Sequence, residues 1–152
     1  VGPYQKKLVE GLKKKGGKDF PVILHSDGNI MSILSDLADS GLDAINPIQP
    51  DALDFETVVK AIGSRMAMTA AFDLRYFLEP NSPEQRLKMS KEVDRLFGII
   101  DAFNTSHLKT GQTGFCIAPT HQVQPGSFVD TYEAWIKIVH EANEKRKNKK
   151  DA

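Results

Sequence analysis

The sequence has few of the features that mark specialised classes of protein. Its 152 residues include one cysteine, Cys116, so an intrachain disulfide scaffold is excluded. No apolar run approaches the roughly 20 residues that a membrane-spanning helix needs. The 20 basic residues are balanced by 20 acidic ones, which argues against a general nucleic-acid or membrane-surface binder. We therefore expect a soluble, cytoplasmic protein that binds neither nucleic acids nor membranes.

Short apolar runs predict four strands, because they are too short and too rich in β-branched residues for helices. These runs are residues 21–24, 43–48, 66–72 and 114–118. The first run shows no alternation of polar and apolar residues, so it predicts a strand buried on both faces. Cys116 lies inside the fourth run, and we interpret it as a small buried hydrophobic residue.

Apolar residues spaced by three and four predict helices between and after these strands. The predicted helices are residues 3–15, 30–38 and 55–62, one that opens at Ser82-Pro83 and one that begins near Asp130. Their predicted buried faces include Leu87, Val93, Leu96, Phe97 and Ile100, and then Tyr132, Trp135, Ile136 and Val139. Strands that alternate with helices require parallel pairing through right-handed crossovers, so the predicted class is α/β.

Polar side chains follow all four predicted strands. In parallel α/β folds, ligands bind at the carboxyl ends of the strands, where the connecting loops converge. The residues that follow the strands are His25, Ser26 and Asp27; Asn46 and Gln49; Asp73 and Arg75; and Thr120, His121, Gln122 and Gln124. We therefore expect a ligand site at this edge of the sheet.

Most of these residues also have a purely structural interpretation. His25 is compatible with a half-buried histidine that has a backbone partner, and Asp27 with a helix cap or Asx turn. Asn46 precedes Pro47 and suits an extended turn residue. Asp73 is compatible with a loop cap or an ion pair with Arg75. Packing explains His121 least well, because it lies in the polar, proline-flanked loop 119–125.

Together these strand-end motifs resemble the C-terminal half of the uroporphyrinogen decarboxylase superfamily. The superfamily includes porphyrinogen decarboxylases and cobalamin-dependent methyltransferases. The motifs are His25-Ser26-Asp27-Gly28-Asn29, residues 41–50, Ala71-Phe72-Asp73, and residues 117–125 with Tyr132-Glu133-Ala134. The resemblance implies about four βα units of a (β/α)₈ barrel. It predicts a single half-barrel domain over residues 1–152, without the N-terminal half.

The methyltransferase branch implies a metal site. Its members hold zinc through a His-x-Cys pair after the fifth strand and a cysteine after the eighth. His25 matches the histidine, whereas Asp27 and His121 stand where the cysteines would be. Histidine and carboxylate both bind zinc, so the resemblance implies a divalent-metal site of His25, Asp27 and His121. Asn46, Gln49 and Asp73 would then orient a small-molecule substrate during methyl transfer, and a corrinoid would be supplied by a partner.

Two other functions stay open. In a porphyrinogen decarboxylase that converts uroporphyrinogen III to coproporphyrinogen III, His121 and Asp73 would contact substrate without a metal. Alternatively, the half barrel is catalytically silent by itself and acts through association with a second copy or with the missing N-terminal half. Edge strands and an uncovered inner face favour such association. The side chains predicted to point to that inner face are among Val22, Leu24, Met66, Met68 and Cys116. Because a second copy could cover this face, we expect a homodimer.

Overall fold

The computed structural model describes residues 2–17, 19–107 and 114–150. Helices and short strands alternate along the chain, as the sequence predicts. The elements are α1 (Gly2–Gly16), β1 (Ile23–His25), the 3₁₀ helix η1 (Met31–Ile33), α2 (Leu34–Asp39), β2 (Ala44–Asn46), α3 (Phe55–Ile62), β3 (Ala67–Thr69), the 3₁₀ helix η2 (Leu74–Leu78), α4 (Pro83–His107), β4 (Phe115–Cys116) and α5 (Val129–Lys150).

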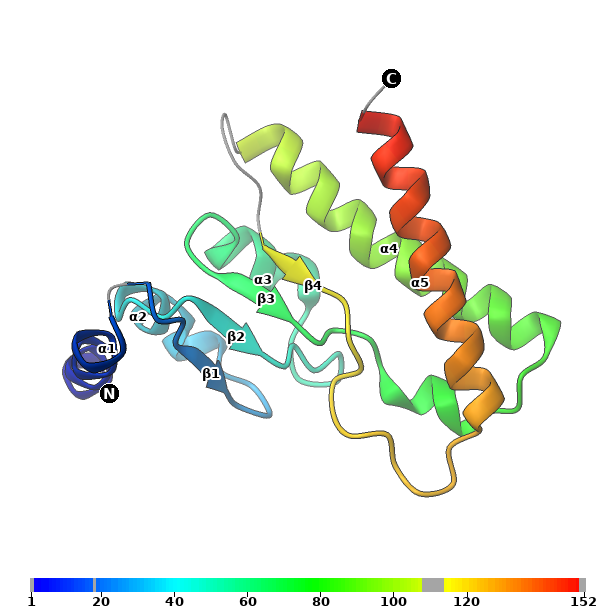
Figure 1. The fold of residues 1–152 in the computed structure, drawn as a ribbon, viewed down its shortest axis with the longest axis horizontal. Helices are drawn as coiled ribbons and strands as arrows, with labels where there is room; N and C mark the ends of the chain where they lie inside the picture. Colours follow the sequence, from blue (N-terminus) through cyan, green and yellow to red (C-terminus); the bar gives the residue numbers. More distant parts are fainter. Residues whose placement is uncertain (1, 18, 108–113, 151–152) are drawn as a thin grey trace.

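The four strands form one sheet in the order β1-β2-β3-β4, and every neighbouring pair is parallel (Figure 1). The spatial order equals the chain order because each crossover moves one strand along the sheet. The register aligns Leu24 with Ile45, Ile45 with Met68, and Met68 with Phe115. This arrangement confirms the parallel α/β prediction.

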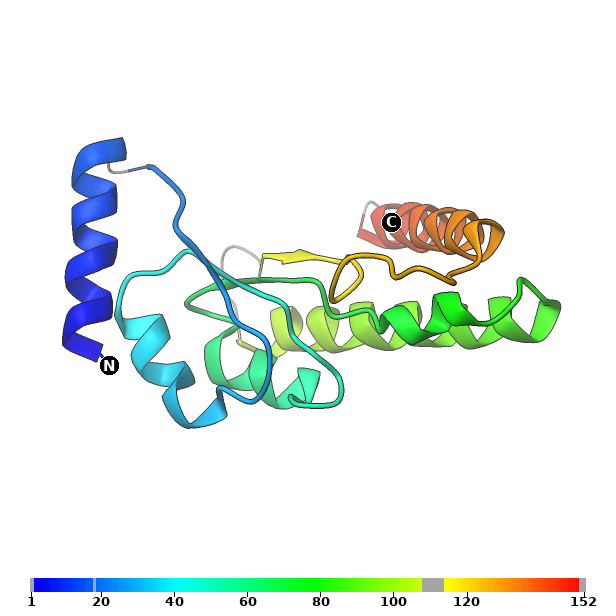
Figure 2. The ribbon, with the colours of Figure 1, turned by 90° about the horizontal axis from the view of Figure 1, so that it is seen from below.

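Helices α2, α3 and α4 lie together on one side of the sheet, and α1 and α5 flank its two ends (Figure 2). The row of aligned side chains that runs from Leu24 through Ile45 and Met68 to Phe115 faces this helical layer. Ile45 and Met68 are fully buried, and the ring of Phe115 packs against Phe55 of α3, with 5.0 Å between the centroids. The main core therefore lies between the sheet and α2–α4.

An aromatic cluster joins η2 and α5 to the segment that follows β3. The ring centroids of Phe72 and Trp135 are 5.2 Å apart, and those of Phe77 and Trp135 are 5.6 Å apart. Tyr132 packs edge-on against Phe77 at 5.1 Å. Offset and edge-on ring pairs are the favoured geometries of aromatic contacts. This cluster holds the first turns of α5 near the carboxyl end of β3.

The opposite side of the sheet is open, which corrects two sequence predictions. Side chains alternate between the faces of a strand, so Ile23 points away from the helical layer and is 57% exposed. Cys116 is exposed as well. The predictions that strand 21–24 is buried on both faces and that Cys116 is buried are therefore wrong. Both residues lie on edge strands, and among the described elements no helix lies over the middle of this side (Figure 2).

Four of the five residues predicted for the inner face lie on the side that faces the helices, whereas Cys116 lies on the open face. Val22, Met66 and Met68 are buried, and Leu24 is partly buried against the same core. A shift of one residue exchanges the two faces of a strand. The open face carries Ile23, Ala44 and Ala67 in one row, followed by the row that contains His25.

The predicted helix boundaries are mostly confirmed. α3 covers residues 55–62 as predicted, and the Ser82 hydroxyl accepts the amide of Gln85 at the start of α4. Two predicted core residues are exposed instead: Leu87, at 55% exposure, and Ile136. α4 and α5 both reach beyond the strands, so part of each helix has no sheet to pack against (Figure 1). None of the helices among the described residues is both long and apolar enough to cross a bilayer.

Candidate functional site

The candidate site begins with two neighbouring residues at the carboxyl ends of β1 and β2. His25 and Asn46 are paired in register across the two strands. The Nδ1 nitrogen of His25 lies 2.7 Å from Oδ1 of Asn46, and the amide of Ser26 donates to the Asn46 carbonyl at 2.8 Å. The peptide bond between Asn46 and Pro47 is cis. Main-chain pairing therefore holds the two side chains next to each other.

Asp27 lies beside the other nitrogen of the His25 ring. Its Oδ1 atom is 3.7 Å from His25 Nε2, and about half of each side chain is exposed. The interpretation of Asp27 as a cap is wrong, because no side chain caps η1 and the nearby turn is closed by Asn29. Asn29 Oδ1 accepts the amide of Met31 at 3.0 Å. The Asp27 carboxylate accepts no hydrogen bond from the part of the chain that the structure describes.

Gln49 holds the loop that carries Asp27. Its Oε1 atom accepts the amide of Gly28 at 2.7 Å. Gly28 has φ of +86° with open space where a Cβ would be, so the backbone conformation, and not crowding, favours glycine here. A substrate contact from Gln49 stays a prediction, and its side-chain oxygen already accepts an amide of this loop.

Asp73 both caps η2 and pairs with Arg75, so both of its structural interpretations are confirmed. The Asp73 carboxylate accepts the Arg75 amide at 2.9 Å and caps η2. It also accepts Nε and Nη2 of the Arg75 guanidinium, which reaches Asp51 at 2.7 Å. The hydrogen bond and charge of Asp73 raise the pKa of Arg75 above its ordinary value. Asp73 therefore faces an internal cation at this edge of the sheet.

The loop after β4 brings His121 across the strand ends. Its backbone is fixed by hydrogen bonds from the Phe72 amide to the Ala118 carbonyl and from the Thr120 amide to the Phe72 carbonyl, at 3.0 and 2.9 Å. The ring centroids of His121 and His25 are 6.5 Å apart, with 70° between their planes. The structure thus brings together His25, Asp27 and His121, and places Asn46 behind His25.

These side chains do not form a preassembled metal centre. No group of three His, Cys, Asp or Glu side chains among the described residues is arranged to hold a metal ion. Two imidazoles on one tetrahedral zinc have centroids about 5 Å apart, less than the 6.5 Å between His25 and His121. His25 and Asp27 fit the spacing of two ligands, whereas His121 lies farther out. As it stands, the site offers an imidazole nitrogen and a carboxylate side by side.

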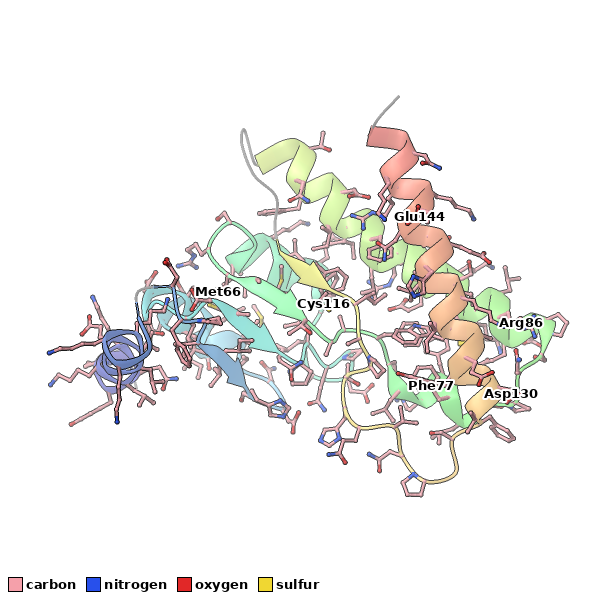
Figure 3. The ribbon with its side chains drawn as sticks, in the orientation of Figure 1. Met66, Phe77, Arg86, Cys116, Asp130 and Glu144 are labelled. Carbon is pink, nitrogen blue, oxygen red and sulfur yellow. The ribbon has the colours of Figure 1, made fainter. Side chains whose placement is uncertain are left out.

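Sequence reasoning missed two residues near the site. Asp51 binds Arg75, and Thr69 aligns with Cys116 in the row that continues from His25 and Asn46 across the open face. Figure 3 shows Cys116 on β4, at the edge of the sheet. A threonine in a strand is ordinary, and Asp51 lies in a loop, so neither gives a signal in the sequence alone.

Comparison with known proteins assigns the fold and the family. The sequence profile described as uroporphyrinogen decarboxylase (URO-D) matches residues 1–142. A solved structure described as a methyltransferase from Methanosarcina mazei aligns with a TM-score of 0.64 at 17% identity, over 94% of this chain and 36% of that chain. No curated protein matches the sequence. The chain therefore spans about a third of that neighbour, and its parallel α/β fold corresponds to part of a (β/α)₈ barrel. It belongs to the uroporphyrinogen decarboxylase family.

Proposed function

We propose that the strand-end site binds a divalent cation, zinc in the first place, for methyl transfer to a small-molecule substrate. The observation that carries the proposal is the 3.7 Å distance between His25 Nε2 and Asp27 Oδ1. Two ligand atoms on one tetrahedral zinc lie about 3.4 Å apart, so this pair has nearly the spacing of two ligands. The likeness to a protein described as a methyltransferase supports the class of reaction.

In this proposal each residue has a separate task. His25 contributes Nε2, Asp27 contributes a carboxylate oxygen, and His121 is the third ligand from the loop after β4. A bound zinc lowers the pKa of a thiol or water in its open position. Asn46 and Gln49 hold His25 and the Asp27 loop in place through the hydrogen bonds described above. The family resemblance adds a corrinoid-bearing partner as the methyl donor.

The proposed activity is that of a larger assembly, to which this chain contributes one set of strand ends. Catalytic groups in (β/α)₈ barrels come from the ends of several strands around the ring, and the chain spans 36% of the solved neighbour. We therefore propose that the chain alone is catalytically silent and needs a partner, either a second copy or an N-terminal half barrel.

Porphyrinogen decarboxylation is the second candidate, and the name of the matching family favours it. His121 and Asp73 would then contact the substrate without a metal. The Asp73 carboxylate is already bound by the Arg75 guanidinium, so a substrate group would have to compete with an internal ion pair. This competition makes the metal-dependent reaction the stronger proposal.

Calorimetric titration of the original, unsubstituted chain with zinc tests the metal proposal. We expect saturable binding that weakens by more than about tenfold in His25→Ala, because a ligand is lost. His140→Ala is the matched control, since His140 is an exposed histidine on α5. Equal zinc affinity of the original chain and His25→Ala would overturn the metal site. Turnover of a porphyrinogen by metal-free protein would favour the decarboxylase.

A further inference from the structure

We propose that Asn46 is a positioning residue that sets the tautomer of His25, keeping the ring proton on Nδ1 and leaving Nε2 as the unprotonated nitrogen. A neutral imidazole carries one donor and one acceptor. The 2.7 Å contact between Nδ1 and Asn46 Oδ1 is a hydrogen bond only when Nδ1 carries the proton. This role differs from the substrate contact that the sequence predicts for Asn46.

Asn46 is well placed for this role because the backbone fixes both partners. His25 and Asn46 are the last residues of adjacent parallel strands and are paired in register. The amide of Ser26 donates to the carbonyl of Asn46, which extends the strand pairing beyond His25. Asn46 is half-buried, and its amide does not titrate. The acceptor therefore keeps its place and its charge at every pH at which the fold is intact.

The two neighbours of the His25 ring favour opposite tautomers. Asp27 Oδ1, at 3.7 Å from Nε2, attracts a proton to that nitrogen. This distance is beyond a hydrogen bond, whereas the 2.7 Å contact with Asn46 is within the normal range. His121 is the second titratable neighbour, and its ring meets His25 edge-on at 6.5 Å between centroids. The balance favours Nδ1–H in the presence of Asn46, and we expect it to reverse when Asn46 is removed.

The consequence for chemistry rests on the proposed function. An imidazole binds a metal or accepts a proton through its unprotonated nitrogen, and the group bound to the other nitrogen determines which one that is. With Nδ1 held by Asn46, the free Nε2 faces Asp27 and the proposed metal position. With the opposite tautomer, the proton would occupy the nitrogen that has to serve as the ligand.

Long-range ¹H–¹⁵N NMR of the metal-free chain, labelled at histidine, tests the inference directly. At about pH 8.5 an ordinary imidazole is neutral, and the two ring nitrogens report which one carries the proton. The His25→Ala spectrum identifies the His25 signals among the four histidines of the chain. We expect Nδ1–H in the original chain, a shift toward Nε2–H in Asn46→Ala, and retention of Nδ1–H in Asn46→Asp, which keeps an acceptor oxygen.

The outcomes separate this inference from the proposed function. Nε2–H in the original chain would overturn the inference, and this measurement does not require Asn46→Ala to fold. An unchanged tautomer in a folded Asn46→Ala would overturn it as well. Nδ1–H in a chain that binds no zinc would leave Asn46 as a positioning residue and overturn the metal site instead.

Discussion

The imidazole rings of His25 and His121 lie 6.5 Å apart between centroids, although His25 ends the first strand of the sheet and His121 follows the last. Two strands, β2 and β3, separate β1 from β4. The loop after β4 spans this width because its backbone is tied to the end of β3, where the Thr120 amide donates to the Phe72 carbonyl. The candidate site therefore depends on this loop as much as on the strands.

Asp27 and Asn29 have separable roles, although they lie in the same loop. In Asp27→Asn we expect weaker zinc binding with an unchanged melting temperature, because the Asp27 carboxylate caps no helix. In Asn29→Ala we expect a loss of about 0.5–1 kcal/mol of stability with zinc affinity retained, because Asn29 closes the turn before η1. Calorimetric titration and thermal unfolding of both variants check this. A lower melting temperature of metal-free Asp27→Asn would contradict it.

Asp54 caps α3 and gives that helix a predictable pH response. Its carboxylate accepts the hydroxyl and the amide of Thr57 at 2.7 and 2.8 Å, and these hydrogen bonds lower the pKa of Asp54. A lowered pKa means that the stabilisation is fully present above the unfolded carboxyl's ordinary value of about 3.9 and is lost as pH falls through the folded value.

We expect Asp54→Ala to cost about 0.5–2 kcal/mol at neutral pH. The difference from the original chain should shrink as the pH falls below about 4. Asp54→Asn is the conservative control, since it keeps a capping oxygen but does not titrate. Denaturant unfolding across this pH range measures both effects, and a difference that grows toward acid pH would refute the sign of the shift.

Arg146 of α5 makes two contacts with α4. Its guanidinium lies 4.2 Å from the centroid of the Phe97 ring and binds both oxygens of Asp101 at 2.8 and 2.6 Å. We expect Arg146→Ala to lower stability by about 1 kcal/mol, and Arg146→Lys to recover only part of it, because lysine lacks the planar fork. Urea unfolding tests this. Lys147→Ala, which removes an exposed pair with Glu144, should cost less than about 0.5 kcal/mol.

The β1 edge and the open face predict self-association. The Val22 carbonyl accepts the amide of Asp43, and the Ser26 amide donates to the Asn46 carbonyl, so both residues face β2. Successive residues of a strand direct their backbone groups to opposite sides, so those of Ile23 and His25 face away from β2. We expect the chain to form dimers at micromolar concentration and Ile23→Lys to weaken them, because a charge on an edge strand opposes pairing. Sedimentation velocity measures this, and Leu87→Lys on α4 is the control at another exposed apolar position. A monomeric original chain would rule out the homodimer.

Local signals in the sequence are sufficient to predict the element order and several element ends. Helix 55–62, the cap at Ser82 and the parallel α/β class follow from local signals, namely apolar spacing, capping residues and alternation of strands with helices. The same signals placed His25, Asp27, Asn46 and His121 at one edge of the sheet, because the carboxyl ends of parallel strands meet there.

Which faces are covered and which polar atoms are already bound is set by contacts that exist only in the folded chain. Ile23, Leu87 and Cys116 are apolar or small in the sequence, yet they are exposed because no described element packs over them. Asn46, Gln49 and Asp73 look like free ligands in the sequence, but their oxygens lie against His25, Gly28 and Arg75. Burial and hydrogen bonding depend on neighbours that are distant in the chain, and local patterns carry no record of those neighbours.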